Sequence, residues 1–238
     1  MGFAIGAVSD KGRVKDKNQD RVYINKGKLN DIPYVLACIC DGIGSFEKSE
    51  ISSQMVVDGL RLWSTSLKEG GFLDIDITEI IADLKDTLQE INELIFERKN
   101  SENIKLGCTM SLLFLFGRQY EIIHVGDSSA YRISEFVTKI TEDETRVSPK
   151  DGKIRLINCV GKSQLLSFKS YFGELEKNQG FVLGSDGLFK RMNFDFFRDS
   201  FLKIETDNDA VNTSRALIDY VLDKGERDNV SAVIVKSL

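Results

Sequence analysis

The run VLACICDGIG, residues 35–44, constrains the fold more than any other stretch of the chain. It is a short apolar segment that stops at Asp41 and is followed by Gly42 and Gly44. A short run of this kind, bounded by glycines, predicts a buried strand rather than a helix. A carboxylate at the end of a core strand is costly unless water, hydrogen-bond donors or a metal ion compensates its charge. Asp41 is therefore a candidate functional residue.

Three further aspartates stand at the edge of an apolar run. They are Asp127 in IIHVGDS, Asp186 in FVLGSDGL and Asp228 in ERDNVSAVIV. Any one of them is explained more simply as a turn residue, because Asp caps its own backbone in tight turns. Four together favour one acidic site, and carboxylate oxygens are the ligands that magnesium and manganese prefer.

Six motifs in the chain form a familiar series. They are SDKGRVKDKNQD (9–20), CDGIG (40–44), LGCTMS (106–111), HVGDSSAY (124–131), LGSDGLF (183–189) and RDNVSAVIV (227–235). In this order they resemble the metal-dependent protein serine/threonine phosphatases of type 2C, in their compact bacterial form. The resemblance spans nearly the whole chain. An unrelated acidic domain with coincidental Asp turns would need all six motifs to arise by chance.

The resemblance implies a ligand set for two divalent ions, Mn²⁺ or Mg²⁺. In that family pattern Asp41 bridges both ions, Asp186 and Asp228 hold the first, and Asp20 with the backbone carbonyl of Gly42 holds the second. Ions about 4 Å apart can share a hydroxide that attacks phosphorus in line. The implied activity is hydrolysis of phosphoserine and phosphothreonine on proteins.

Three positions qualify this expectation. Asp127 corresponds to a ligand of a third ion, so two or three ions are expected. Lys15 stands where the family usually has an Arg that orients the phosphate, and an ammonium is a point charge rather than a planar fork. Without the resemblance, Lys15 reads as a solvated loop lysine. Phe46 replaces the usual histidine, and loss of a general acid typically costs on the order of 10²–10⁴ in rate.

Two functions therefore remain open. The first is an active metal-dependent phosphatase, favoured because every proposed metal ligand is present. The second is a phosphatase-like module that binds or senses phosphoproteins with weak or no turnover, suggested by Lys15, Phe46 and a short flap. The resemblance also implies a phosphorylated protein substrate and a cognate Ser/Thr kinase as partners.

The composition limits the class of protein. With 238 residues and only two prolines, the chain is expected to form a single domain over residues 1–238. A formal charge of -5 argues against a general nucleic-acid binder. The longest apolar run, residues 111–116, is far too short to cross a bilayer, and the N-terminus lacks a signal-peptide pattern. A cytoplasmic monomer is expected.

The order of the predicted elements indicates an α+β fold. Residues 2–9 and 21–25 are expected to form a pair of strands, and helices with apolar stripes follow over 51–67 and 77–95. Residues 106–116, 120–125 and 129–140 then predict an antiparallel meander. Helices followed by hairpins favour segregated α+β structure. The resemblance refines this to a four-layer α-β-β-α sandwich of two antiparallel sheets flanked by helices.

The remaining expectations concern the C-terminal half and single residues. The segment around 141–160 is expected to be a shortened flap, and NFDFFRDSFL has the apolar spacing of a helix. The last helix is predicted with Asp207 as its cap and Gly225 past its end. Asn229 is expected to brace the Asp228 turn. The single histidine, His124, and the four cysteines are expected to be structural.

Overall fold

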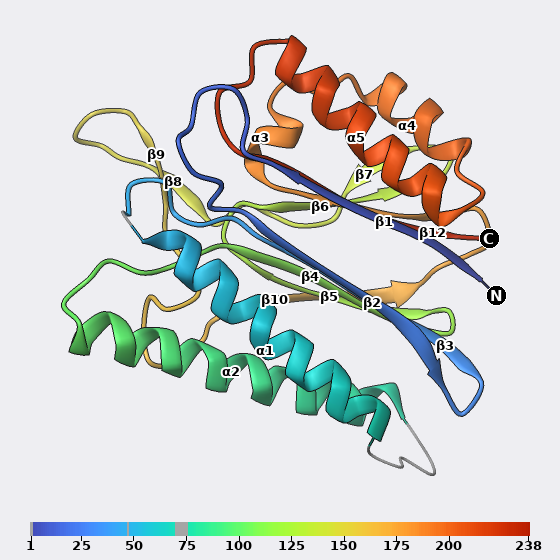
Figure 1. The fold of residues 1–238 in the computed structure, drawn as a ribbon, viewed down its shortest axis with the longest axis horizontal. Helices are drawn as coiled ribbons and strands as arrows, with labels where there is room; N and C mark the ends of the chain where they lie inside the picture. The colour runs from blue at the N-terminus through green and yellow to red at the C-terminus, as the bar shows by residue number, and fades with distance from the viewer. Residues whose placement is uncertain (1, 47, 70–75) are drawn as a thin grey trace.

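The computed structural model describes residues 2–46, 48–69 and 76–238. Two five-stranded antiparallel sheets lie face to face, and helices cover the outer face of each (Figure 1). The strand order is β1-β12-β11-β6-β7 in the first sheet and β10-β5-β4-β3-β2 in the second. The predicted four-layer α+β sandwich is confirmed.

The strands follow the apolar runs of the sequence. The first sheet contains β1 (Phe3–Asp10), β12 (Val230–Ser237), β11 (Gly180–Gly184), β6 (Ser129–Ile133) and β7 (Val137–Lys139). The second contains β10 (Lys169–Glu174), β5 (Gln119–Val125), β4 (Met110–Phe116), β3 (Ile32–Cys40) and β2 (Arg21–Leu29). Every residue of β4 is buried, because the other sheet covers one face and helices cover the other.

Helices α1 (Ser49–Glu69) and α2 (Ile77–Ser101) cover the second sheet, as the two apolar stripes predict. Helices α3 (Asp186–Phe189), α4 (Phe194–Leu202) and α5 (Asp207–Asp223) cover the first. No helix in the described part of the chain is long and apolar enough to cross a membrane.

The cap predicted for α5 is wrong by one residue. Thr206 is the N-cap. Its Oγ1 accepts a hydrogen bond from the Asp209 amide at 3.1 Å, and the Asp209 carboxylate accepts one from the Thr206 amide. Such a reciprocal capping box satisfies two otherwise unpaired amides. Asp207 instead accepts the Ile5 amide at 2.9 Å and thereby joins the helix to β1. Gly225 lies past the end of the helix with a φ of 85°, as predicted.

Two predicted strand pairings are also wrong. The strands at 2–9 and 21–25 exist but do not pair, because β1 pairs with β12 and β2 pairs with β3. The predicted meander extends only over β4 and β5, since β6 crosses to the other sheet and pairs with β11. Gly126, with a φ of 101°, lies in the short turn where the chain changes sheets.

A small hairpin, β8 (Thr145–Val147) and β9 (Ile154–Leu156), projects from the segment predicted to be a flap. In Figure 1 it extends from the left end of the sandwich. The sequence indicated an irregular segment there, because the two strands have only three residues each. That this flap is shorter than those of related proteins stays a prediction.

Candidate active site

The structure brings the strand-edge aspartates together at one end of the two sheets. Asp41 directly follows β3, Asp127 follows β5, Asp186 begins α3 after β11, and Asp228 precedes β12. Asp41 lies close enough to the others for their charges to raise its pKa. Three of these residues follow the C-terminal ends of strands and Asp228 precedes the N-terminal end of an antiparallel strand, so all four lie at the same end of the sandwich. Their role as metal ligands stays a prediction.

Asp20 lies deepest in this group, with 1% of its surface exposed. Its Oδ2 accepts a hydrogen bond of 2.7 Å from the Ser231 hydroxyl, whereas its Oδ1 has no hydrogen-bond partner. Burial raises the pKa of Asp20 to about 6, although hydrogen bonds from Ser231 and Ser185 oppose the shift. A buried carboxylate oxygen without a partner is costly, so this atom indicates a position for a cation.

The pKa of Asp41 is also raised well above its usual value. The first cause is desolvation, and the second is repulsion from the neighbouring carboxylates of Asp20, Asp186, Asp127 and Asp228. Asp127 is raised to a pKa of about 6, again by burial first and then by Asp186. Repulsion of this kind favours either protonation or a bound cation.

The donor set fits a hard divalent cation. All proposed ligands are oxygens, and one of them, Asp20 Oδ1, is buried and unpartnered. Within residues 2–46, 48–69 and 76–238, no three His, Cys, Asp or Glu side chains lie close enough to enclose a metal ion by themselves. Magnesium commonly keeps several waters and takes only one or two carboxylates, so a widely spaced acidic cluster suits it.

Gly42 allows the backbone to pass close to its neighbours after Asp41. A Cβ at this position would lie 2.8 Å from Ser49 Oγ and 2.9 Å from the Gln19 carbonyl oxygen. The Gly42 amide also donates a hydrogen bond of 3.2 Å to that carbonyl. Any residue other than glycine at position 42 would displace these neighbours, and Gly42 is the residue whose carbonyl is the predicted metal ligand.

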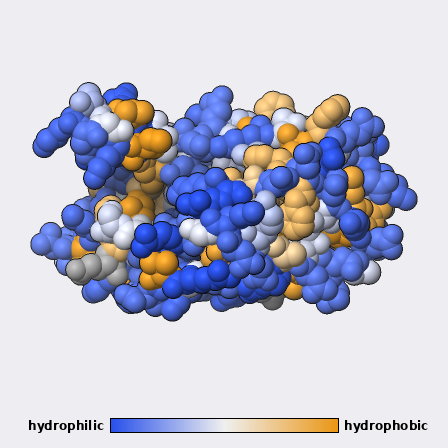
Figure 2. Space-filling model, turned by 90° about the horizontal axis from the view of Figure 1, so that it is seen from above, coloured by the Kyte–Doolittle hydropathy of each residue, from blue (hydrophilic) through white to orange (hydrophobic). Residues whose placement is uncertain are grey.

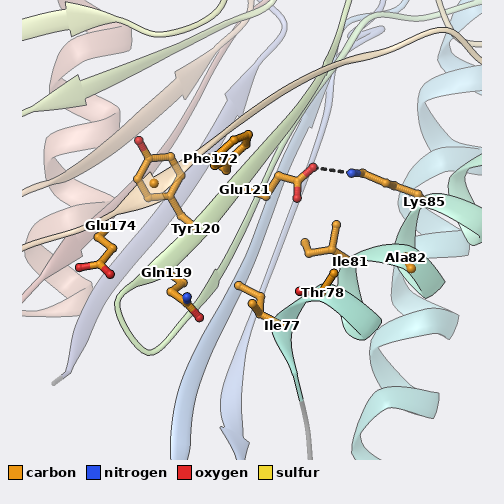
Figure 3. A pocket seen from close by; sticks show the side chains of 11 residues that line it. Ile77, Thr78, Ile81, Ala82, Lys85, Gln119, Tyr120, Glu121, Phe172 and Glu174 are labelled. Atoms are coloured by element: carbon orange, nitrogen blue, oxygen red, sulfur yellow. Dashed lines mark ion pairs between the residues drawn. The ribbon is translucent and has the colours of Figure 1, made fainter.

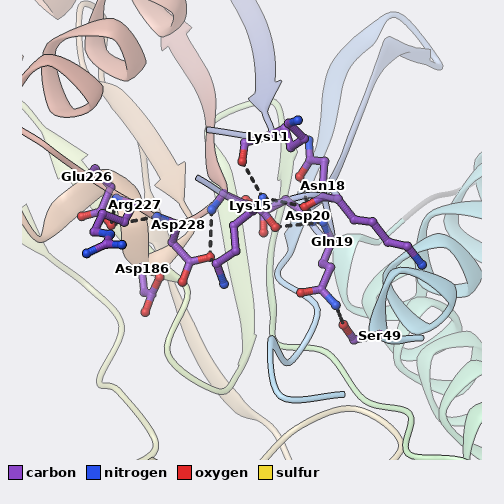
Figure 4. Close-up of polar contacts among 12 residues, drawn as sticks. Lys11, Lys15, Asn18, Gln19, Asp20, Ser49, Asp186, Glu226, Arg227 and Asp228 are labelled. Atoms are coloured by element: carbon purple, nitrogen blue, oxygen red, sulfur yellow. Dashed lines mark hydrogen bonds and ion pairs between the residues drawn. The ribbon is translucent and has the colours of Figure 1, made fainter. Parts of the chain in front are cut away.

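Two lysines pair with the acidic cluster. Lys15 Nζ lies 2.8 Å from Asp228 Oδ1, which places it beside the acids rather than out in solvent (Figure 4). Lys190, at the C-terminal end of α3, pairs with Asp186. Sequence reasoning missed Lys190, although its position four residues after Asp186 on a helical turn predicts such contact.

Asn229 holds the loop that carries Lys15 and Asp20. Its side chain accepts the Gln19 amide at 2.9 Å and donates to the carbonyls of Lys11 at 2.8 Å and Lys17 at 2.9 Å. Asn229 braces its own turn as predicted, since its amide donates to Asp228 Oδ1 at 2.8 Å, and its side chain in addition holds a loop more than 200 residues away in sequence. Gln19 continues the network by donating to Ser49 Oγ at 2.5 Å.

His124 lies within β5 and is fully buried. Its Nδ1 lies 2.9 Å from Ser111 Oγ, and its Nε2 lies 2.9 Å from the Gly126 carbonyl oxygen. Burial lowers the pKa of the imidazole. These contacts favour the structural role. Of the four cysteines, Cys38, Cys40 and Cys108 are buried, as expected for small core residues, and Cys159 is partly exposed.

Two cavities differ in their relation to the acids. One of about 560 Å³ lies between the turn after Asp41 and the flap segment, with Ile43 and Phe46 on one side and residues 154–159 on the other. Another of about 450 Å³ lies between α2 and strands β5 and β10, where Lys85 pairs with Glu121 at 2.6 Å (Figure 3). Neither is lined by a residue of the acidic cluster, but the first borders the turn that follows Asp41.

Comparison with known proteins adds independent information. Residues 11–221 match the family described as "Protein phosphatase 2C". The serine/threonine protein phosphatase PstP of Mycobacterium tuberculosis is 23% identical over 248 residues, covering 96% of this chain and 44% of PstP. The chain thus spans less than half the length of that relative.

Solved structures share the fold. PppA of Pseudomonas aeruginosa superposes with a TM-score of 0.83 at 22% identity, covering 100% of this chain and 99% of PppA. The catalytic domain of PstP in complex with two manganese ions gives a TM-score of 0.78 at 23% identity, covering 98% of this chain and 97% of that domain.

Proposed function

This chain belongs to the protein phosphatase 2C family, and from that premise we propose that it hydrolyses phosphoserine and phosphothreonine on proteins with divalent metal ions. The observation that carries the proposal is the acidic cluster, in which the buried Oδ1 of Asp20 lacks a hydrogen-bond partner. The solved PstP domain holds two manganese ions, which supports Mn²⁺ or Mg²⁺ here.

Asp41 would serve both ions, Asp186 and Asp228 would hold the first, and Asp20 with the Gly42 carbonyl would hold the second. Asp127 would serve a third ion. When bound, such ions supply an activated water for attack on phosphorus and offset the charge of the phosphoryl oxygens. A carboxylate must be deprotonated to act as a ligand. Because the pKa values of Asp20 and Asp41 are raised, protons compete with the metal ions for both side chains.

The other groups of the site act on the substrate. Lys15 would hold a phosphoryl oxygen of the substrate and weaken its ion pair with Asp228. Both side chains are about one-third exposed, so a substrate can reach the lysine. Phe46 cannot donate a proton to the departing alkoxide. We therefore expect slow turnover of alkyl phosphates and a smaller handicap for aryl phosphates, whose leaving groups need less protonation.

The proposal is tested by the hydrolysis of a phosphothreonine peptide with Mn²⁺, with Mg²⁺ and with chelator, beside an Asp186→Ala variant. Metal-dependent turnover that disappears with chelator and in the variant is expected. Tight peptide binding without turnover by the wild type would overturn the proposal in favour of a binding or sensing module. That alternative is not favoured, because the family match extends over most of the chain and the proposed ligands are intact.

Further proposals rest on the same family membership. We infer one catalytic domain over residues 1–238, a monomer in the cytoplasm, and a Ser/Thr kinase whose products this protein dephosphorylates. Size-exclusion chromatography with light scattering tests the monomer, and a second subunit at micromolar concentration would contradict it.

A further inference from the structure

The β8–β9 hairpin places two arginines directly opposite each other. Arg146 and Arg155 are partners in the antiparallel register, so their side chains leave the same face of the hairpin. Like charges in this arrangement are destabilising. Asp151 pairs with Arg155 and offsets part of that repulsion, whereas no ion pair of the described residues involves Arg146, so Arg146 is the member of the pair that is open to an anionic partner.

The hairpin is cationic as a whole, in a chain with more acidic than basic residues. Residues 145–156 contain Arg146, Lys150, Lys153 and Arg155 but only one carboxylate, Asp151. Asp151 pairs with Arg155 at 2.6 Å. In the part of the chain that the structure describes, no carboxylate forms an ion pair with Arg146, Lys150 or Lys153.

The hairpin borders a cavity whose other side is the turn that follows Asp41. The cavity of about 560 Å³ has Arg155 and Lys162 on its flap side and Phe46, a few residues after Asp41, on the other side. A second cavity of about 310 Å³ shares Ser45 with it and adds Lys48 and Lys105. Among the described residues that line these two cavities there is no carboxylate.

The opposite face of the hairpin is apolar. Val147 and Ile154 are register partners and are 60% and 72% exposed. Hydrophobic and charged surface are seen together at the end of the molecule that carries this hairpin (Figure 2). Ile154 and Arg155 both line the cavity of about 560 Å³, so a polypeptide seated there would meet apolar and cationic side chains together.

We propose that the hairpin and the two adjoining cavities bind the substrate segment beside the phosphorylated residue, and that this segment is acidic. This inference rests on the proposed function, since it names the substrate class of that same site. Carboxylates or a second phosphate near the phosphorylated residue would meet Arg146 and Lys153 on the hairpin and Lys48 and Lys105 beside the turn. Opposite charge across an interface raises specificity and the rate of encounter.

The test uses three phosphothreonine peptides of equal length whose flanking residues are acidic, neutral or basic. We expect kcat/KM with Mn²⁺ to be roughly tenfold higher for the acidic peptide than for the neutral one, and lowest for the basic one. The double variant Arg146→Glu/Lys153→Glu should abolish or reverse this order. Both side chains are exposed and lack ion pairs, so the variant should fold normally.

A matched control changes the same charge elsewhere. Lys28 and Lys203 are exposed, and Lys28 lies at the end of β2 opposite to the end where Arg21 pairs with Cys40 beside Asp41. The Lys28→Glu/Lys203→Glu variant should keep the preference for the acidic peptide. Turnover of a small aryl phosphate, which cannot reach the hairpin, should be the same in all three proteins.

Binding of the same peptides, measured by fluorescence anisotropy, separates the two proposals because it needs no turnover. Charge-selective binding without hydrolysis would refute the phosphatase but support the docking surface. Hydrolysis with equal kcat/KM and equal affinity for all three peptides would refute the docking surface but support the phosphatase. An equal loss of the preference in the hairpin variant and the control would also overturn the docking surface, because a general field of the protein would then explain it.

Discussion

Replacement of Asn229 by alanine tests whether the loop that carries Lys15 and Asp20 is held in place by this one side chain. Asn229 is buried and makes three hydrogen bonds to the loop backbone, at 2.9, 2.8 and 2.9 Å. At about 1 kcal/mol per bond, the variant should lose about 3 kcal/mol in the free energy of unfolding. For a chain of this size, that corresponds to a fall in Tm of roughly 6–12 °C.

Asn92 offers a matched control. It is equally buried and also makes three bonds to loop backbone, donating to Ser163 and Gln164 at 3.0 and 2.9 Å and accepting the Gly161 amide at 2.8 Å. Asn92→Ala should therefore lose a similar free energy of unfolding. Its loop contains none of the proposed metal ligands.

The two variants should differ in function. At a temperature where both are folded, Asn229→Ala should bind Mn²⁺ more weakly and lose on the order of 10² in kcat/KM, because small displacements of positioned groups have effects of that size. Asn92→Ala should keep wild-type Mn²⁺ binding and wild-type turnover of a small aryl phosphate, because its loop supplies Lys162 to the cavity beside the flap but none of the proposed metal ligands. The assays are urea unfolding, calorimetric Mn²⁺ titration and hydrolysis of a small aryl phosphate. Equal functional losses in both variants, or wild-type Mn²⁺ binding by Asn229→Ala, would refute the reasoning.

Three other outcomes are expected. Lys15→Arg should lower KM for a phosphopeptide several-fold, because a guanidinium can hold two phosphoryl oxygens, and an unchanged or higher KM in steady-state kinetics would count against that role. Gly42→Ala should cost about 1–3 kcal/mol in urea unfolding, because the new Cβ meets Ser49 and the Gln19 carbonyl. Gly44→Ala should be tolerated, because its Cβ meets the flexible end of Lys15 at 3.3 Å and Gln19 Oε1 at an ordinary contact distance of 3.7 Å. Mn²⁺ affinity should fall as the pH drops below about 6, because Asp20 and Asp127 have pKa values raised to about 6 and protonation competes with the metal; a titration showing constant affinity between pH 7 and pH 5 would contradict this.

The sequence was most informative where residue type and strand end coincide. An apolar run that stops at an aspartate identifies both a strand and the place of its carboxylate, which is why Asp41 and Asp186 could be located without a structure. The apolar pattern of a strand does not show which of the two sheets the strand joins. The pattern of β6 is compatible with pairing to β5, and only the turn at Gly126 and the fit to β11 decide that it crosses to the other sheet.

Contacts distant in sequence were the least accessible. Nothing in the local pattern around Asn229 indicates that it holds residues 11–19. Nor does the local pattern indicate that Asp207 bonds to Ile5 and Lys26 while Thr206 caps the helix. The β8–β9 hairpin is too short for an alternating pattern to be distinguished from a loop. Its opposed arginines become visible only once the register is known.

The acidic cluster links stability to metal binding. Mutual repulsion raises the pKa of Asp41, and an unpartnered oxygen of Asp20 is enclosed by the fold, so the site opposes folding as long as its charge is uncompensated. Lys15 and Lys190 offset part of that charge by pairing with Asp228 and Asp186, but among the described residues no lysine or arginine forms an ion pair with Asp20 or Asp41. A divalent ion that binds the folded state alone must therefore stabilise it. The expected result is a higher Tm with Mn²⁺ than with chelator in the wild type, and an equal Tm in both would contradict this link between stability and metal binding.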